Sequence, residues 1–115
     1  CTQSIGRDLS NEARMGQARS VAQKCELVQA DNRLACMRGA VYALVDNTWD
    51  GRYALPFCAA FANQTDREDC FDASIQYLRT FFEKPVEDIA GDCSRHVANP
   101  SRCAEMAARQ QKNGL

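Results

Sequence analysis

The stretch CAAFANQTDREDC, residues 58–70, begins and ends with cysteine and carries a run of turn-compatible polar residues, Asn63 to Asp66, at its middle. Two further stretches repeat this arrangement, CELVQADNRLAC at residues 25–36 and CSRHVANPSRC at residues 93–103. Each stretch predicts a helical hairpin, in which a cysteine near the end of one helix faces a cysteine near the start of the next. The sequence thus predicts three hairpins, each closed by a local disulfide.

Six cysteines allow fifteen pairings, so the local pairing is an inference from the turns. The alternative places both cysteines of a pair about three turns apart on one continuous helix, as in twin-cysteine hairpin proteins of the mitochondrial intermembrane space. Turn residues between the partners, such as Asp31-Asn32 and Asn99-Pro100, argue against that alternative. The predicted disulfides are Cys25–Cys36, Cys58–Cys70 and Cys93–Cys103.

Apolar periodicity predicts an all-α fold of about six helices, because no segment shows the alternation that is typical of a strand. Ser10, Asp31, Asp66 and Ser101 are the expected N-caps, and Pro85 is expected to open a helix. Pro56 is expected to start the third helix late or to kink it. The expected helices run from Ser10 to about Val28, from Asp31 to a break at 47–51, from Arg52 to Ala62, from Asp66 through Phe82, from Pro85 to Asn99, and from Ser101 onward.

The three hairpins also align as repeats with a period of 33 to 35 residues. Four residues before the first cysteine of each pair stand Val21, Ala54 and Ile89. One residue after the second cysteine stand Met37, Phe71 and Ala104. The last unit carries less apolar bulk than the others, as expected of a terminal unit in a stacked array.

This rhythm of paired helices resembles tetratricopeptide and Sel1-like repeats, although the Trp, Leu-Gly and Tyr positions of the tetratricopeptide consensus are missing. The resemblance covers residues 10–112 and concerns architecture. It implies that the hairpins stack as a short right-handed array in a single domain over residues 10–115.

The first four residues, Cys1-Thr2-Gln3-Ser4, resemble the start of a mature bacterial lipoprotein. The resemblance implies that the Cys1 thiol carries a lipid and that residues 1–9 form an N-terminal tether that holds the domain at a membrane surface. Because Thr2 is not aspartate, it also implies sorting to the outer membrane, facing the periplasm. The alternatives are that Cys1 forms an intermolecular disulfide in a secreted protein or marks the end of a fragment.

Composition restricts the other functions that the chain can have. It has 115 residues, a formal net charge of −1 and seven cysteines, which favours a disulfide-bonded protein of an oxidising compartment and disfavours nucleic-acid binding. His96 is the only histidine and aligns with Val28 and Phe61, inside a helix, so we predict a half-buried structural role and no catalytic residues. We expect no cofactor and no metal, since a zinc site of Cys93, His96 and Cys103 would require the third disulfide to be absent.

Acidic residues near expected helix starts, Glu68, Asp69 and Asp72 in one group and Glu87 and Asp88 in another, are explained by the helix dipole. They are not read as a catalytic pair.

Aromatic residues concentrate in the central third of the chain, and the pairs Phe57–Phe61 and Phe81–Phe82 are not expected all to face inward. We therefore predict a partner-binding surface near Trp49, Tyr53 and Phe81. The expected function is that of a non-enzymatic, membrane-tethered accessory or assembly subunit of an envelope complex that works through protein–protein contacts. The alternative is a secreted or periplasmic module that binds a small apolar ligand or lipid.

Overall fold

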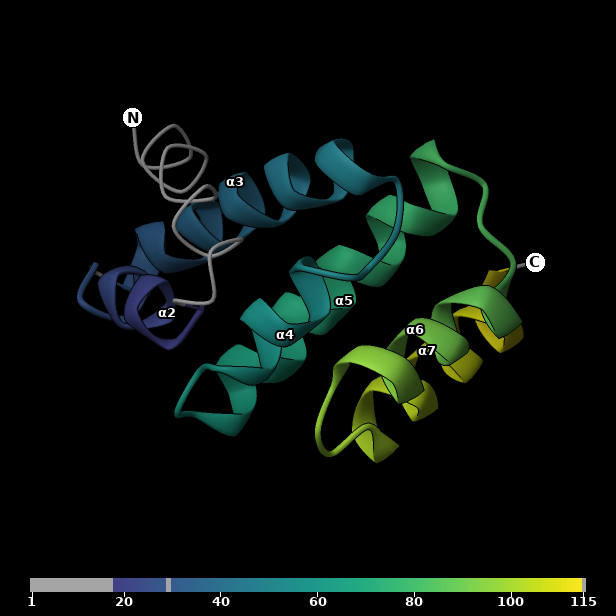
Figure 1. Cartoon of the computed structure of the whole chain (residues 1–115). Helices are drawn as coiled ribbons and strands as arrows, with labels where there is room; N and C mark the ends of the chain where they lie inside the picture. The colour runs from purple at the N-terminus through teal and green to yellow at the C-terminus, as the bar shows by residue number, and fades with distance from the viewer. Residues whose placement is uncertain (1–17, 29, 115) are drawn as a thin grey trace.

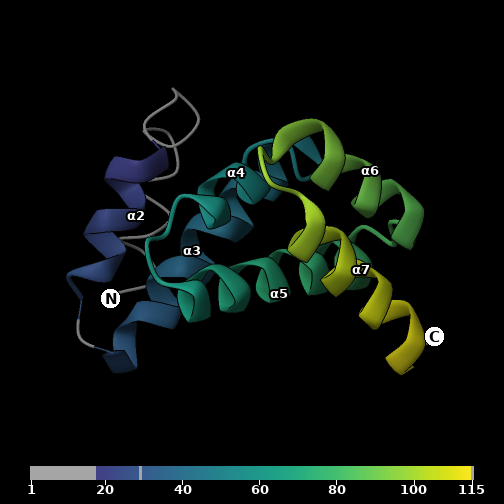
Figure 2. The ribbon, with the colours of Figure 1, turned by 90° about the horizontal axis from the view of Figure 1, so that it is seen from below.

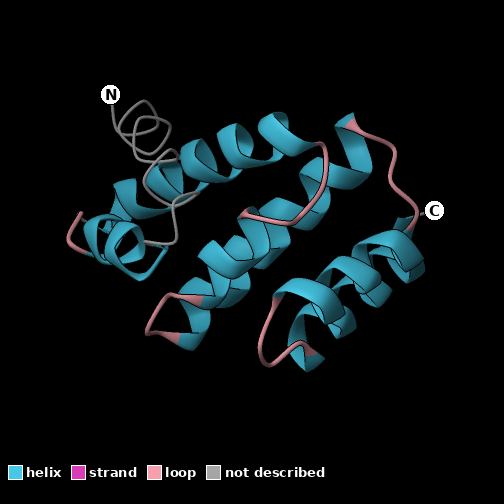
Figure 3. Cartoon of the chain, viewed as in Figure 1, coloured by secondary structure: helices cyan, strands magenta, loops and turns pink. Residues whose placement is uncertain are grey.

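Six helices make up the part of the chain that the computed structural model describes, residues 18–28 and 30–114, and these residues contain no strand (Figures 1 and 3). The all-α prediction is therefore confirmed. The helices are α2 (Ala18–Glu26), α3 (Ala30–Thr48), α4 (Ala54–Ala59), α5 (Gln64–Phe81), α6 (Val86–His96) and α7 (Ser101–Gly114).

Three disulfides join successive helices, α2 to α3, α4 to α5 and α6 to α7, and confirm the predicted local pairing. The Cα atoms of Cys25 and Cys36 are 5.7 Å apart, those of Cys58 and Cys70 5.2 Å, and those of Cys93 and Cys103 5.8 Å. The alternative with both cysteines on one helix is wrong, since a turn separates the partners in every pair. All six disulfide-bonded cysteines are fully buried, so the bridges also form part of the core.

The three hairpins stack in two layers, with the first helices α2, α4 and α6 on one side and the second helices α3, α5 and α7 on the other (Figure 2). The aligned repeat positions explain the stacking. Val21, Ala54 and Ile89 are all fully buried, and each comes from the first helix of its hairpin. On the second helices, the equivalent position is less buried toward the C-terminus: Met37 and Phe71 are buried, whereas Ala104 is half-buried.

Two arginines at equivalent positions in the first two hairpins have a role that was not predicted from the sequence. Arg33 and Arg67 each stand three residues before the second cysteine of their unit. The Arg33 guanidinium donates to the carbonyl of Glu26 over 3.2 Å, and that of Arg67 donates to the carbonyl of Phe61 over 2.8 Å. Each arginine therefore satisfies a free carbonyl at the end of the preceding helix. The third unit has Pro100 at this position and lacks the contact.

Two predicted N-caps are wrong, one in each of the first two hairpins. Helix α3 begins at Ala30, so Asp31 lies inside the helix. Helix α5 begins at Gln64 because the side chain of Asn63 accepts from the backbone N–H of Thr65 over 2.8 Å. Asp66 is instead a buried residue of the first turn, where its carboxylate pairs with Arg33 at 3.3 Å. Asn63 precedes Asp66 in the chain and caps the helix. The side chain of Asp66 is therefore available to face α3.

The remaining helix ends differ from prediction by one to three residues. Helix α4 covers only Ala54–Ala59, with Pro56 in its first turn, where a missing N–H costs nothing; the late start is therefore correct. Ser101 is the first residue of α7 and not its N-cap, because the Pro100 carbonyl already accepts from Ala104. Helix α2 ends at Glu26, before Val28, and the predicted cap Ser10 lies outside the described residues.

A buried contact between Gly51 and Asp92 fixes the α3–α4 loop against α6. The Gly51 N–H donates to the Asp92 carboxylate over 2.9 Å, and the same carboxylate pairs with Arg95 at 2.9 Å. A Cβ atom at Gly51 would lie 2.5 Å from Cδ1 of the fully buried Leu55. Close packing against Leu55 therefore requires glycine at position 51.

We predict that Gly51→Ala lowers the free energy of unfolding by about 1–3 kcal/mol, because the buried Leu55 has little room to move. Gly91→Ala is the matched control. Its Cβ would meet only the exposed guanidinium of Arg95, at 3.2 Å, and alanine favours the helix by about 1 kcal/mol. Urea unfolding followed by circular dichroism measures both variants, and equal losses in the two would contradict the packing explanation.

Candidate functional site

Five aromatic rings form a continuous cluster at the adjacent ends of α3 and α5. Tyr77 is its centre, with ring centroids 4.4 Å from Tyr42, 4.8 Å from Phe81 and 5.7 Å from Phe82. Trp49 joins through Phe82 at 6.3 Å. We call these five residues the aromatic cluster.

Parallel packing of α3 and α5 brings the rings together. The contacts Arg33–Asp66, Tyr42–Tyr77 and Trp49–Phe82 advance along both helices in the same direction, so the two C-terminal ends meet. The Tyr77 hydroxyl also donates to the Asp46 carboxylate over 2.6 Å, which fixes the central ring between the helices. The repeat alignment does not predict this pair, because Tyr42 lies six residues after Cys36 whereas Tyr77 lies seven residues after Cys70.

The cluster ends in two large exposed side chains. Trp49 is 68% exposed and Phe81 is 69% exposed. Tyr53, predicted to join them, is half-buried and packs against the core, and the ring contacts that connect Trp49 with Phe81 run through Phe82 and Tyr77. Leu27 is also exposed, but it lies between α2 and α3, at the opposite end of α3 from Trp49.

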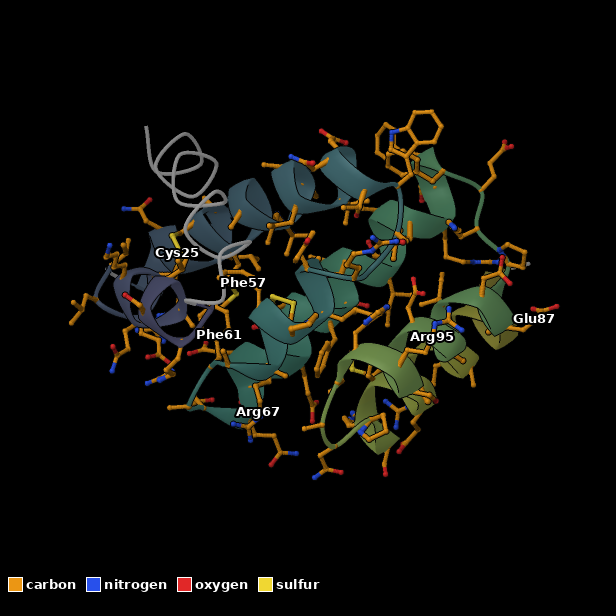
Figure 4. The ribbon with its side chains drawn as sticks, in the orientation of Figure 1. Cys25, Phe57, Phe61, Arg67, Glu87 and Arg95 are labelled. Atoms are coloured by element: carbon orange, nitrogen blue, oxygen red, sulfur yellow. A yellow bond between two sulfur atoms is a disulfide. The ribbon has the colours of Figure 1, made fainter. Side chains whose placement is uncertain are left out.

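The other aromatic pair singled out from the sequence lies inside. Phe57 and Phe61 are both buried, with ring centroids 5.3 Å apart, so only the Phe81–Phe82 pair divides between core and solvent. Figure 4 shows their side chains in the region between α4 and α2, near Cys25. Phe61 follows the end of α4, and leaving the helix frees its ring to turn inward beside Phe57.

Trp49 has a backbone conformation that tryptophan rarely adopts. Its φ is 64°, in the left-handed region, where it ends α3 while its N–H donates to the Val45 carbonyl over 2.7 Å. Glycine is the usual residue at such a helix end, and a side chain there costs about 1–2 kcal/mol. A strained and exposed tryptophan is poorly explained by stability, which makes it a candidate for binding.

A groove of about 410 Å³ runs between α3 and α5 and reaches the aromatic cluster. Its walls include Arg38 from α3 and Asp69 and Asp72 from α5. Burial raises the pKa of Asp69, and the neighbouring carboxylates Asp66, Asp72 and Glu68 raise it further, against the opposing effect of Arg38. The groove therefore joins an acidic section to an aromatic end.

A second groove, of about 380 Å³, separates the second and third hairpins. Glu68 and Arg102 both line it and pair with each other at 3.0 Å. The hydrogen bond from Arg102 lowers the pKa of Glu68, with a further contribution from Gln64. Glu68, the carboxylate among the described residues of this groove, is thus already paired with an arginine, which distinguishes this groove from the acidic one.

The residues considered from the sequence as catalytic or metal-binding candidates do not come together in the structure. His96 is half-buried, as predicted, but it is the last residue of α6 and not an internal one. Cys93 and Cys103 are bonded to each other, which removes two of the three ligands of the conceivable zinc site. Within the described part of the chain, no group of three or more histidine, cysteine or acidic side chains is placed to hold a metal ion.

The acidic residues Glu87 and Asp88 lie in the first turn of α6, where they complement the helix dipole. Glu87 points away from the helices in Figure 4. None of the helices in the described ranges is long and apolar enough to cross a bilayer.

Comparison with known proteins finds no match to a family model, to a curated protein or to a solved structure. The resemblance to tetratricopeptide and Sel1-like repeats is therefore confined to the helical, disulfide-stapled architecture, and the right-handed sense of the array stays a prediction.

We predict that Asp69→Asn raises the melting temperature at pH 7. An acid whose pKa is raised by folding destabilises the folded state where it is ionised, so the gain should disappear below about pH 4, where Asp69 is protonated in both states. Glu68→Gln is the control of opposite sign, since folding lowers the pKa of Glu68 and its stabilisation is present at pH 7 and lost as the pH falls. Thermal unfolding between pH 3 and 7 measures both, and a gain that persists at pH 3 would contradict the electrostatic cause.

We also predict that Trp49→Gly changes the free energy of unfolding by less than about 1 kcal/mol, because relief of the left-handed strain offsets the lost contact with Phe82. Phe57→Ala, which removes a buried ring, is expected to cost about 3–5 kcal/mol. Chemical denaturation compares them. A loss at Trp49 as large as that at Phe57 would show that the tryptophan is needed for stability.

Proposed function

We propose that this protein is a non-enzymatic binding subunit that contacts a protein partner through Trp49 and Phe81. The observation that carries the proposal is the pair of large aromatic side chains left exposed on one continuous aromatic cluster. Aromatic residues, tryptophan above all, dominate the energetics of protein interfaces. The half-buried Tyr77 and Phe82 behind them hold the exposed rings in place, so little conformational entropy is lost on binding.

Rigidity supports the same proposal. Each hairpin is closed by a buried disulfide, and the parallel helices α3 and α5 present the rings from a fixed base. A surface that is already ordered binds without the cost of ordering. The rival role as a carrier of a small apolar ligand is less favoured, because both grooves carry charged side chains on their walls.

Three disulfides indicate an oxidising, extracytoplasmic environment for the domain. Within that environment we propose that Cys1 is lipidated and that residues 1–9 tether the domain to a membrane surface, with the outer membrane favoured. Cys1 lies outside the described residues. Its support is that the other six cysteines are paired with one another, which leaves Cys1 without a partner cysteine in this chain. The proposed place of action is then an envelope complex, with the protein as an accessory or assembly subunit.

The partner surface is tested by photo-crosslinking in the cells that produce the protein. Benzoylphenylalanine in place of Phe81 is expected to give a discrete covalent adduct with one partner, seen as a mass shift on a denaturing gel. The same amino acid in place of Leu27 is the matched control, because Leu27 is 87% exposed but lies outside the cluster.

Trp49→Gly in the Phe81-labelled protein is expected to abolish the adduct while leaving the thermal stability nearly unchanged. Equal adducts from positions 27 and 81, or an adduct that survives loss of Trp49, would contradict binding through the cluster.

A further inference from the structure

We propose that Asp92 of α6 is a positioning residue for the partner-binding surface. It acts through Gly51 to hold Trp49 in its left-handed backbone conformation, and partner binding thereby depends on the third hairpin. This inference rests on the proposed function and deepens it, since it names what keeps Trp49 ready to bind. The observation that carries it is the hydrogen bond from the Gly51 N–H to the Asp92 carboxylate, two residues after Trp49 in the chain.

The loop from α3 to α4 is short and is fixed at several points (Figure 1). On the α3 side, the Trp49 N–H donates to the Val45 carbonyl over 2.7 Å. On the α4 side, the Gly51 carbonyl accepts from the Leu55 N–H over 3.0 Å, while the Gly51 N–H is held by α6. Asp50 is the single residue between Trp49 and Gly51. The position of Gly51 therefore determines the direction in which the chain leaves Trp49.

This constraint explains why Trp49 has a φ of 64°. A side chain disfavours the left-handed region, and a residue stays there only where its surroundings fix it. The bond from Gly51 has a carboxylate as its acceptor, and hydrogen bonds to charged groups are among the stronger ones in proteins. Both of its partners are buried, so water does not compete for the N–H. The bond to Asp92 thus offsets the strain at Trp49.

The backbone conformation of Trp49 decides where its ring lies. The ring centroid is 6.3 Å from that of Phe82, and the side chain is exposed. If Gly51 were released, Trp49 could return to the backbone regions that residues with a side chain prefer, and the direction of its Cβ would change. The indole would then leave Phe82, and the aromatic cluster would lose one of its two exposed rings. Trp49 therefore has two discrete states, and the bond to Asp92 selects the one that binds.

Asp92 exerts this effect without touching the partner. Its side chain is 8% exposed and belongs to α6, whereas the aromatic cluster lies on α3 and α5 and directly after them. Its other contact is the ion pair with Arg95, whose side chain is 64% exposed. A loss of partner binding on removal of Asp92 would therefore report a change of position at Trp49 and not the loss of a direct contact.

The test follows the fluorescence of Trp49, the single tryptophan of the chain, together with the crosslinked adduct from position 81. D92A removes the acceptor of the Gly51 N–H. We expect it to increase the fast local rotation of the indole in the anisotropy decay. We also expect it to lower the yield of the adduct by about fivefold or more, the lower end of typical coupling between two sites. D92N keeps a side-chain oxygen that can accept from Gly51, so it is expected to retain most of both properties.

Matched controls separate this bond from a general loosening of the third hairpin. R95Q removes the ion pair and leaves the bond between Asp92 and Gly51. I89V removes a methyl group from a fully buried residue of α6 and leaves both partners of the bond in place. Both variants are expected to resemble the unchanged protein. Circular dichroism checks that each variant is folded. Should D92A fail to fold, glycolic acid in place of Gly51 makes the same test, because it exchanges the N–H for an ester oxygen and keeps Asp92.

The outcomes distinguish this inference from the proposed function. An unchanged adduct from D92A, with or without a change in indole motion, overturns the inference and leaves the proposed function standing. A loss in R95Q or I89V as large as that in D92A, or in D92N as large as in D92A, also overturns the inference, because the bond to Gly51 would not be the cause. An adduct that survives Trp49→Gly contradicts the proposed function itself, whatever the variants of Asp92 show.

Discussion

The disulfide between the end of one helix and the start of the next is the constraint on which the structure depends. It holds two helix termini with Cα atoms 5.2 to 5.8 Å apart in each hairpin, and its sulfur atoms are buried with the apolar side chains. Closing such a loop of 10 to 12 residues stabilises by about 2–3 kcal/mol on the chain-entropy model. A small core can therefore be built from short helices, among them the six-residue α4.

Hairpins closed in this way stack with corresponding helices side by side. This arrangement determines which side chains form the surface between α3 and α5. The second helices α3 and α5 run in parallel, so residues at similar heights along the two helices meet, as Tyr42 meets Tyr77. At one end of the α3–α5 pair, Arg33 forms an ion pair with the buried Asp66. At the other end, the core covers the aromatic side chains only in part, and Trp49 and Phe81 remain exposed. The groove between the helices connects an acidic section to an aromatic one because Asp69 and Asp72 lie on the same helix, α5, as Tyr77 and Phe81.

Two features at this surface oppose stability, and their coincidence supports a binding role. Trp49 occupies a left-handed conformation that glycine would adopt without strain, and burial together with neighbouring carboxylates raises the pKa of Asp69. Sites that bind a partner commonly retain groups that are unfavourable in the free protein. In contrast, the acidic residue at the neighbouring hairpin interface, Glu68, has a lowered pKa and an arginine partner.

The sequence by itself determined the helical class, the three disulfides and the repeat period, because these depend on local turn chemistry and on spacing along the chain. It also marked Trp49 and Phe81 as surface candidates. Only the tertiary structure decided which helices run side by side, and with that the roles of Tyr77 and Tyr53. A helix cap such as Asn63 also required the structure, since adjacent polar residues compete for the same backbone N–H groups. Neighbours within a hairpin are encoded locally, whereas contacts between hairpins depend on the shape that all the buried side chains adopt together.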